Sequence, residues 1–366
     1  MSPNKRTGRK RDYVGVLSSV FAIVIGLLVG FVILLICNPS QALPGFVTIL
    51  TGAFTHGLKG VGQVFYYATP IILTGLSVGF AFKTGLFNIG TPGQFIVGAF
   101  AAVYVGIMWT GLGRIQWAVA LLAAILGGAL WGMVPGFLKA CFNVNEVIAS
   151  IMMNYIGMYM VNWIVKSYKP LFNNLRNESR NVAATAQIPK MGMDKLFPES
   201  SVGGGILLAI AAVLIIWVIL NKTTFGYELK AVGFNRDASR YAGINEKRNI
   251  IMSMVIAGAI AGMAGGLLYL AGTGKHIEIK DVLAPEGFTG ISVALLGLSH
   301  PIGVLFSGLF IAYLTAGGFY LQLFEFSTEI IDIIVAVIIY FSAFALIVKT
   351  ILTRMNRKRE KGDGRT

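Results

Sequence analysis

The sequence contains few charged residues. Only 13% of its 366 residues are Asp, Glu, Lys or Arg, whereas a soluble globular domain carries about 25%. Hydrophobic residues make up 55% and form long runs, such as residues 14–37, 206–220 and 330–348. Because about 20 apolar residues in a helix cross a hydrocarbon core of about 30 Å, these runs indicate transmembrane helices. The composition excludes an ordinary soluble protein and predicts an all-α polytopic membrane protein.

Cysteine and histidine are also scarce. The two cysteines, Cys37 and Cys141, fall at the ends of different apolar runs. A disulfide needs Cα atoms within about 7 Å of each other, so we expect none. The three histidines, His56, His276 and His300, are far apart and lie at loop positions. We therefore expect neither a metal site nor catalytic residues.

Two further motifs are missing. No G-x-x-x-x-G-K-[ST] phosphate loop occurs, since residues 272–276 have the lysine but lack the first glycine and the final Ser or Thr. The chain should therefore bind no ATP or other cofactor itself. No buried acid–base relay or catalytic pair appears within the apolar runs, which disfavours an intramembrane enzyme. An ion-coupled secondary transporter, which needs a mid-membrane ion site, stays open as a less favoured alternative.

Lys and Arg predict the topology. Cytoplasmic loops collect these residues, and the tail from Lys349 is strongly basic, as is the N-terminus. An even number of spans places both termini in the cytoplasm, together with 20 of the 30 Lys and Arg residues. The run after the basic N-terminus, about 24 residues, exceeds the 7–15 residues of a signal peptide. We predict ten spans, with the eighth short and broken near Pro301: 13–37, 62–82, 92–110, 117–139, 147–166, 203–221, 249–272, 287–298, 301–320 and 329–348. If the eighth and ninth were one crossing, nine spans would result.

The segments outside these spans follow from that topology. The chain is expected to form a single transmembrane domain, residues 1–366, with a basic cytoplasmic N-terminus (1–12) and a basic cytoplasmic tail (349–366). A partly ordered extracytoplasmic loop is expected at 167–202. A cytoplasmic loop is expected at 222–248.

Glycine is abundant, at 45 of 366 residues. Small residues allow membrane helices to approach closely. Two runs have glycine at every fourth position, and each should form a smooth ridge: Gly128, Gly132 and Gly136, and Gly258, Gly262 and Gly266. Close helix packing is the favoured interpretation, and a gating hinge is the alternative.

The cytoplasmic loop contains the signals of a short helix. Asn235 is a good N-cap, Asp237 suits a first turn and Gly243 suits a C-terminal stop. A two-turn helix between two spans has no ligand pocket of its own. It has the size of an element that docks in a groove of another protein, although an ordinary surface helix would show the same signals.

Four stretches carry a resemblance to a known family. Residues 227–244 with 257–262 resemble the coupling region of permease subunits of bacterial ABC importers, in the branch for ribose-type sugars, branched-chain amino acids and nucleosides. Residues 85–94 are similar to the FNIG-x-x-GQ signature of its nucleoside-type members, and 145–156 and 290–303 match two further segments. Thr91-Pro92 departs from the usual pattern, which has Glu at the second position.

The resemblance implies an importer permease in the bacterial cell membrane, most favourably for nucleosides, with a ribose-type sugar permease as the alternative. It implies a cytoplasmic ATPase that binds ATP, a second and non-identical permease, and an extracytoplasmic substrate-binding lipoprotein; a nucleic-acid partner is not expected. The coupling residues that it implies are Gly226, Tyr227, Glu228, Leu229, Ala231, Gly233, Asn235, Arg236, Ala238, Tyr241, Ala242 and Gly243.

Polar residues near the third and fifth spans, most of them uncharged, are candidates for the substrate pathway. Amides both donate and accept hydrogen bonds, which suits hydroxyls and purine edges. The candidates are Asn88, Gln94, Glu146, Ser150 and Asn154. Interhelical hydrogen bonding is the alternative for the uncharged members, and for Glu146 it is favourable placement at a helix N-terminus.

Overall fold

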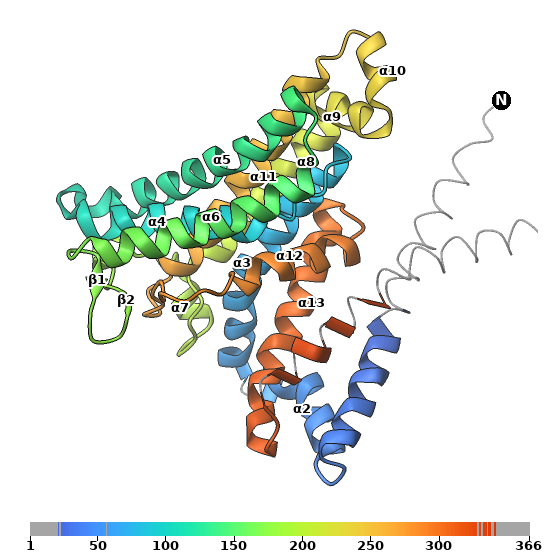
Figure 1. Cartoon of the computed structure of the whole chain (residues 1–366). Helices are drawn as coiled ribbons and strands as arrows, with labels where there is room; N and C mark the ends of the chain where they lie inside the picture. The colour runs from blue at the N-terminus through green and yellow to red at the C-terminus, as the bar shows by residue number, and fades with distance from the viewer. Residues whose placement is uncertain are drawn as a thin grey trace, which may run out of the picture. The chain divides into compact units, whose positions relative to one another are not determined.

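The computed structural model describes residues 21, 23–55, 57–327, 329–330, 332–334, 336–337 and 340–341, and these are predominantly helical (Figure 1). The chain divides into two compact units. Unit 1 comprises residues 1–55 and 314–366, and unit 2 comprises residues 56–313. Unit 1 contains the apolar helix Ile23–Cys37, the helix α2 (Ala42–Thr55) and the 3-10 helix η3 (Tyr320–Phe324).

Unit 2 contains the long helices α3, α4, α5, α6, α8 and α11, and most of α13, which continues into unit 1. Their bounds are α3 (Gly57–Lys83), α4 (Thr91–Met108), α5 (Gln116–Phe142), α6 (Glu146–Ser167), α8 (Gly205–Lys222), α11 (Glu246–Tyr269) and α13 (Pro301–Phe319). Each of these seven helices is long and apolar enough to cross a membrane. Two of these spans include an adjoining 3-10 turn: η1 (Thr110–Ile115) precedes α5, and η3 follows α13. Each of the seven coincides with one of the predicted spans.

The remaining predicted spans have different outcomes. The eighth is the helix α12 (Pro285–Leu296), and its break before α13 falls at Pro301 as predicted. Its 12 residues measure about 18 Å, less than the hydrocarbon thickness of about 30 Å. The first and tenth spans lie partly outside the described residues, and the segments 1–12 and 349–366 lie entirely outside them. The count of ten and the cytoplasmic termini therefore stay predictions.

The helix α11 forms the centre of unit 2, and glycine explains how closely its neighbours approach. A Cβ atom on Gly128 would collide with Gly258 O and would lie 2.7 Å from Gly262 Cα. A Cβ on Gly98 of α4 would collide with Gly262 in the same way. The glycine ridges of α5 and α11 thus face each other, which confirms the prediction that they serve helix packing.

The helix α12 runs beside α3 in the same direction. Gly290 packs on the backbone of Thr74, and a Cβ atom added to Gly79 would lie 3.5 Å from Ser299 Cα. The N-terminal end of α12 approaches the start of α4, where Gly287 packs on Pro92. Because both helices begin at this level, beside the middle of α3, unit 2 contains two helices whose N-termini meet within the bundle.

The predicted extracytoplasmic loop, residues 167–202, is ordered throughout. It forms the hairpin strands β1 (Phe172–Asn173) and β2 (Glu178–Ser179), the 3-10 turn η2 (Ala184–Ala186) and the short helix α7 (Met193–Leu196). Figure 1 shows this segment at the end of unit 2 opposite to α9 (Thr224–Phe234) and α10 (Arg236–Tyr241), the two helices of the predicted cytoplasmic loop. The two loops therefore lie at opposite ends of unit 2, and their assignment to the two sides of the membrane stays a prediction.

Candidate functional site

The predicted cytoplasmic loop contains two helices, and a capping residue precedes each of them. Thr223 accepts a hydrogen bond from Gly226 N (3.1 Å) and begins α9. Asn235 ends α9 with an extended backbone, and its Oδ1 accepts from Ala238 N (2.9 Å) to begin α10. Gly243 follows α10 at φ +83°. The N-cap and the glycine stop are both as predicted, whereas the preceding helix α9 was not predicted separately.

One face of α9 is fixed to the membrane helices. A Cβ on Gly226 would collide with Ile219 O of α8, and one on Gly233 would collide with Lys83 O at the end of α3. Leu229 is fully buried. Glu228 accepts a hydrogen bond from Asn249 Nδ2 of α11 (3.0 Å). The helix therefore contacts three spans through atoms that have little room to move.

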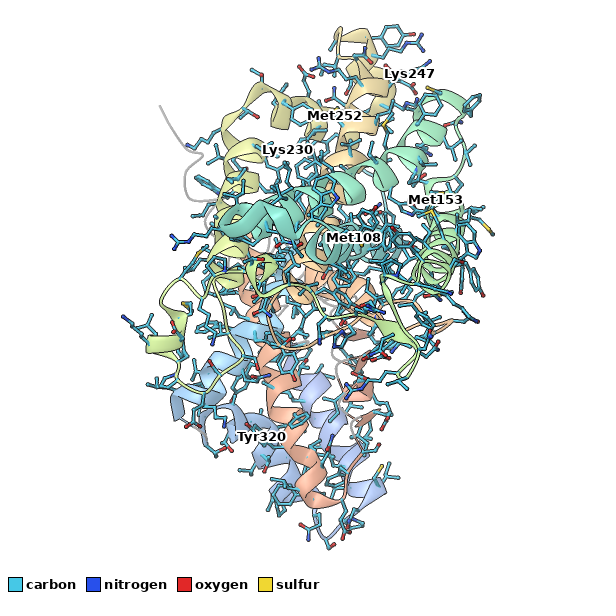
Figure 2. All side chains as sticks on the ribbon, turned by 90° about the vertical axis from the view of Figure 1, so that its left-hand side faces the viewer. Met108, Met153, Lys230, Lys247, Met252 and Tyr320 are labelled. Carbon is cyan, nitrogen blue, oxygen red and sulfur yellow. The ribbon has the colours of Figure 1, made fainter. Side chains whose placement is uncertain are left out.

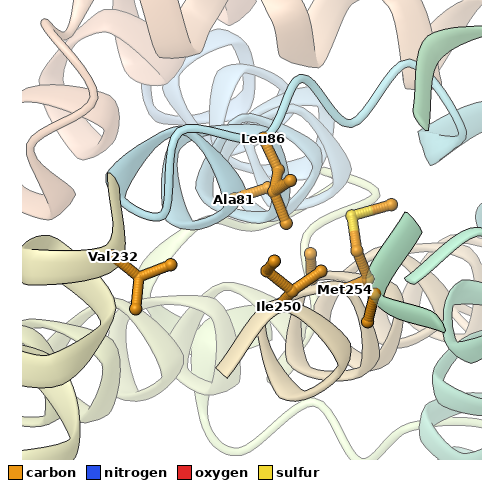
Figure 3. Close-up of a cluster of buried hydrophobic side chains, with 7 residues drawn as sticks. Ala81, Leu86, Val232, Ile250 and Met254 are labelled. Carbon is orange, nitrogen blue, oxygen red and sulfur yellow. The ribbon is translucent and has the colours of Figure 1, made fainter. Parts of the chain in front are cut away.

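A buried hydrophobic cluster extends this connection (Figure 3). The cluster contains Val232 of α9 together with Ala81 of α3, Leu86 of the segment after α3, and Ile250 and Met254 of α11. Two small residues, one from α5 and one from α11, complete the cluster: Ala140 and Ala257. Because protein interiors are closely packed, a displacement of α9 is transmitted to α3, α5 and α11 rather than absorbed.

The other face of α9 and α10 is open. Tyr227, Phe234 and Tyr241 are 72%, 91% and 93% exposed, although large aromatic side chains are usually buried. Between the two helices lies a groove of about 550 Å³. Its lining residues are Thr224, Tyr227, Glu228, Ala231, Phe234, Asn235, Ala238, Ser239, Ala242 and Ile244. We call this open face, with the groove and Tyr241, the coupling surface.

The predicted coupling residues divide between the two faces. Gly226, Leu229 and Gly233 fix α9 to the bundle, and Asn235 and Gly243 shape α10. Arg236 donates to Asn143 Oδ1 (3.4 Å), and Glu228 lines the groove while it also accepts from Asn249 of α11. The residues on or beside the open face are Tyr227, Glu228, Ala231, Arg236, Ala238, Tyr241 and Ala242. Phe234 was missed. No signal in the sequence indicates its exposure, because large aromatic residues are usually buried.

Basic side chains accompany the coupling surface. Lys230 of α9 donates to Asn221 Oδ1 (3.0 Å), and Lys247 is the second residue of α11. Figure 2 shows both lysines at the end of unit 2 that carries α9 and α10. Because lysine and arginine collect in cytoplasmic loops, these residues are among those from which the orientation is predicted.

The structure brings Asn88 and Gln94 together. Their side-chain amides exchange two hydrogen bonds, from Asn88 Nδ2 to Gln94 Oε1 (2.9 Å) and from Gln94 Nε2 to Asn88 Oδ1 (3.1 Å). Asn88 Oδ1 also accepts from Gly90 N, and Asn88 Nδ2 lies 3.4 Å from Ser77 Oγ. Both amides are buried. The pair fixes the turn, residues 84–90, that leads from α3 back into the bundle to begin α4.

Asn154 and Ser150 of α6 complete this buried amide cluster. Asn154 Nδ2 donates to Ile89 O (3.0 Å), and its Oδ1 accepts from Gly93 N (2.9 Å). Ser150 is fully buried beside Gly90, and its Oγ has no hydrogen-bond partner among the described residues. The three amides are thus engaged in holding the turn, which supports the structural interpretation of these residues over direct contact with a solute.

Glu146 has a separate environment. It is the first residue of α6, and its Oε2 forms an ion pair with Lys139 Nζ of α5 at 2.8 Å. The preceding residue, Asn145, is the N-cap and accepts from Val147 N (2.9 Å). An acid in the first turn interacts favourably with the helix dipole. Glu146 therefore ties the ends of α5 and α6 together and lies apart from the amide contacts.

Seven apolar helices that are long enough to cross a membrane define a polytopic membrane protein. Residues 60–343 match the family described as the branched-chain amino acid transport system / permease component. The chain belongs to this family of transport subunits, which are not enzymes.

Named relatives agree with this assignment. The guanosine ABC transporter permease protein NupP of Bacillus subtilis is 38% identical over 340 residues, 93% of this chain and 96% of the relative. The nucleoside ABC transporter permease protein NupB of Lactococcus lactis is 34% identical over 345 residues, 93% of each chain. The glucose ABC transporter permease protein TsgB13 of Haloferax volcanii is 32% identical over 305 residues, 81% of this chain and 78% of the relative. No solved structure matches the chain.

Proposed function

We propose that the chain is a membrane subunit of a bacterial ABC importer that carries nucleosides across the plasma membrane, with ATP bound and hydrolysed by a partner ATPase that docks on the coupling surface. The observation that carries the proposal is the pair of helices α9 and α10, which are packed on three spans on one side and expose aromatic residues on the other. Such an element can pass a movement of a docked partner to the bundle.

The cargo assignment rests on the relatives. Two of them, from different bacteria, are named for guanosine and for nucleosides, and this chain covers more than nine tenths of each. The relative named for glucose is the observation that favours a sugar as second candidate. Both cargoes are small and polar, and both would need a pathway through the bundle.

The remaining partners are proposed from the family resemblance and from the predicted topology. A second, non-identical permease would complete the pathway, as the family resemblance implies. A substrate-binding lipoprotein would deliver the cargo to the end of unit 2 formed by the hairpin β1–β2 and η2, opposite to the coupling surface (Figure 1).

The docking proposal is tested in the reconstituted complex with substitutions at two exposed positions. Tyr241→Ser removes an aromatic side chain from the coupling surface, and Leu175→Ser is its control, because Leu175 is 96% exposed at the opposite end of unit 2. We expect the first to weaken co-purification of the ATPase and to lower uptake by at least about tenfold, the loss of one strong contact. Equal ATPase binding by both variants would show that α10 is not the docking element.

The cargo proposal is tested by uptake of labelled guanosine, uridine and ribose into proteoliposomes that contain the complete transporter. We expect ATP-dependent uptake of the nucleosides, and ribose should neither enter nor compete. Uptake of a free sugar alone would replace the nucleoside assignment by the sugar alternative.

A further inference from the structure

The helix α6 exposes one long face. Its large exposed side chains recur at intervals of three or four residues, which places them in one stripe. They are Ile148, Met152, Tyr155, Ile156, Tyr159 and Trp163. The opposite face holds Ser150 and Asn154 against the 84–90 turn. In Figure 2, Met153 marks the course of this helix.

Two tyrosines of the stripe lie at mid-helix. The 22 residues of α6 measure about 33 Å, and Tyr155 and Tyr159 lie about 14 and 20 Å from its first residue. Tyrosine and tryptophan of membrane helices gather at the interfaces, where their polar tips reach water. Trp163, near the far end of the helix, agrees with that preference. Tyr155 and Tyr159 do not.

The hydroxyls of these two tyrosines are also unpaired. Tyr155 and Tyr159 are 46% and 53% exposed, and within the described part of the chain neither hydroxyl has a hydrogen-bond partner. A hydroxyl that faces hydrocarbon without a partner is unfavourable. The stripe therefore has the wrong chemistry for a surface that meets only acyl chains.

Two other spans, α5 and α8, provide the comparison with a purely apolar exposed surface. Outside their last turns, the large exposed side chains of α5 are Leu122, Leu126, Leu130, Met133, Val134 and Phe137, and those of α8 are Leu207, Leu214, Ile215 and Val218. All of them are hydrocarbon or thioether. The hydroxyl-bearing stripe on α6 differs from both helices at the same depth.

We propose that the α6 stripe lines the solute pathway, and that Tyr155 and Tyr159 contact the aromatic base of the cargo. This inference rests on the proposed nucleoside function. A phenol ring stacks on the face of any nucleobase, and its hydroxyl both donates and accepts hydrogen bonds. One turn apart on one face, the two rings offer the base successive contacts along its path, whereas the buried amide cluster on the other face of α6 is already engaged.

Thiol accessibility tests the location of the stripe in the complete transporter. The background carries Cys37→Ser and Cys141→Ser, because both native cysteines are exposed. Tyr155→Cys and Tyr159→Cys are compared with Leu214→Cys. Leu214 is similarly exposed and lies about 12 Å from the Lys222 end of α8, which is on the same side of unit 2 as the first residue of α6. We expect a hydrophilic thiol reagent to react with both tyrosine positions at least about tenfold faster than with the α8 position, and guanosine to slow the reaction. Rates equal to that of the α8 control would place the stripe against lipid and overturn the proposal. Fast reaction without an effect of guanosine would overturn the contact with the base.

Uptake tests the role of the rings. Tyr155→Leu and Tyr159→Leu should each lower guanosine uptake by at least about fivefold, the lower end of what one stacking contact contributes. Tyr155→Phe and Tyr159→Phe, which keep the ring, should retain most of the uptake, and Leu214→Ala should have no effect. Wild-type uptake by both leucine variants would refute this inference alone. Absence of nucleoside uptake by the unmodified transporter would instead refute the proposed function, and with it the contact with a base.

Discussion

Two glycines of the bundle should respond to alanine in opposite directions. Gly262, in α11, and Gly79, in α3, are both interior helical positions. A helix-interior glycine replaced by alanine normally gains about 1 kcal/mol of stability, because glycine loses more backbone entropy on folding. The surroundings of the two positions decide whether that gain is realised.

At Gly262 the added Cβ would collide with Ala124 O and would lie 2.9 Å from Gly128 Cα, whereas at Gly79 the three nearest atoms lie at 3.5–3.8 Å. The first contacts are with backbone, which cannot rotate away. Overpacking of this kind costs about 1–3 kcal/mol. After the helical gain of about 1 kcal/mol, Gly262→Ala should lose up to about 2 kcal/mol, whereas Gly79→Ala should gain up to about 1 kcal/mol.

Thermal melting of the detergent-purified protein measures the difference. About 1–3 kcal/mol should separate the two variants, with Gly79→Ala melting at or above the wild-type temperature and Gly262→Ala below it. A third variant, Gly262→Ser, which adds one more atom, should melt no higher than Gly262→Ala. If Gly262→Ala melted as high as Gly79→Ala, the contact between the α5 and α11 ridges would not be as close as described.

Substitutions at three further sites test the 84–90 turn, the glycine stop after α10, and the ion pair between Glu278 and Lys280 in the segment between α11 and α12. Asn88→Ala should destabilise the protein by about 1–3 kcal/mol in thermal melting, because it leaves the buried amide of Gln94 without its partner; an unchanged melting temperature would argue against the reciprocal bonds. Gly243→Val should lower ATPase stimulation, because it forces a branched residue to φ +83° at a cost of about 1–2 kcal/mol. Gly243→Asn should keep most of the stimulation, because asparagine tolerates this conformation better. No atom lies within 4 Å of the added Cβ, so equal effects of both variants would exclude the backbone explanation. The hydrogen bond and charge of Lys280 lower the pKa of Glu278 below its usual 4.5, so its small stabilising contribution is present above the unfolded pKa and lost as the pH falls through the folded pKa. Lys280→Met should remove that acid sensitivity, and an identical pH profile of melting would contradict it.

The structure confirms most of what local patterns could indicate. Apolar runs placed seven spans correctly, because length and hydropathy are properties of the segment itself. The N-cap Asn235 and the stop at Gly243 were also predictable, since capping depends on a few consecutive residues. The helix α9 was missed, because its apolar face looks like part of a loop until α3 and α11 supply the surface that buries it.

The pathway candidates show the limit of the same reasoning. Polarity alone could not distinguish a solute contact from a packing contact at Asn88, Gln94 or Asn154, because the partners of these amides are distant in sequence or depend on the turn between α3 and α4. The sequence did not predict a role for the tyrosines of α6, because aromatic residues are common in apolar runs. Their significance appears only once the exposed and buried faces of α6 are known.

By itself the sequence determined the class of the protein: a polytopic helical permease. Hydrophobicity, glycine spacing and capping act over a few turns of helix, so one segment suffices to read them. Only the tertiary structure decided which polar residues are engaged in packing and which face is open, because both properties depend on partners brought together from separate helices. The amides of Asn88, Gln94 and Asn154 are engaged in this way, whereas Tyr155 and Tyr159 lie on the open face of α6.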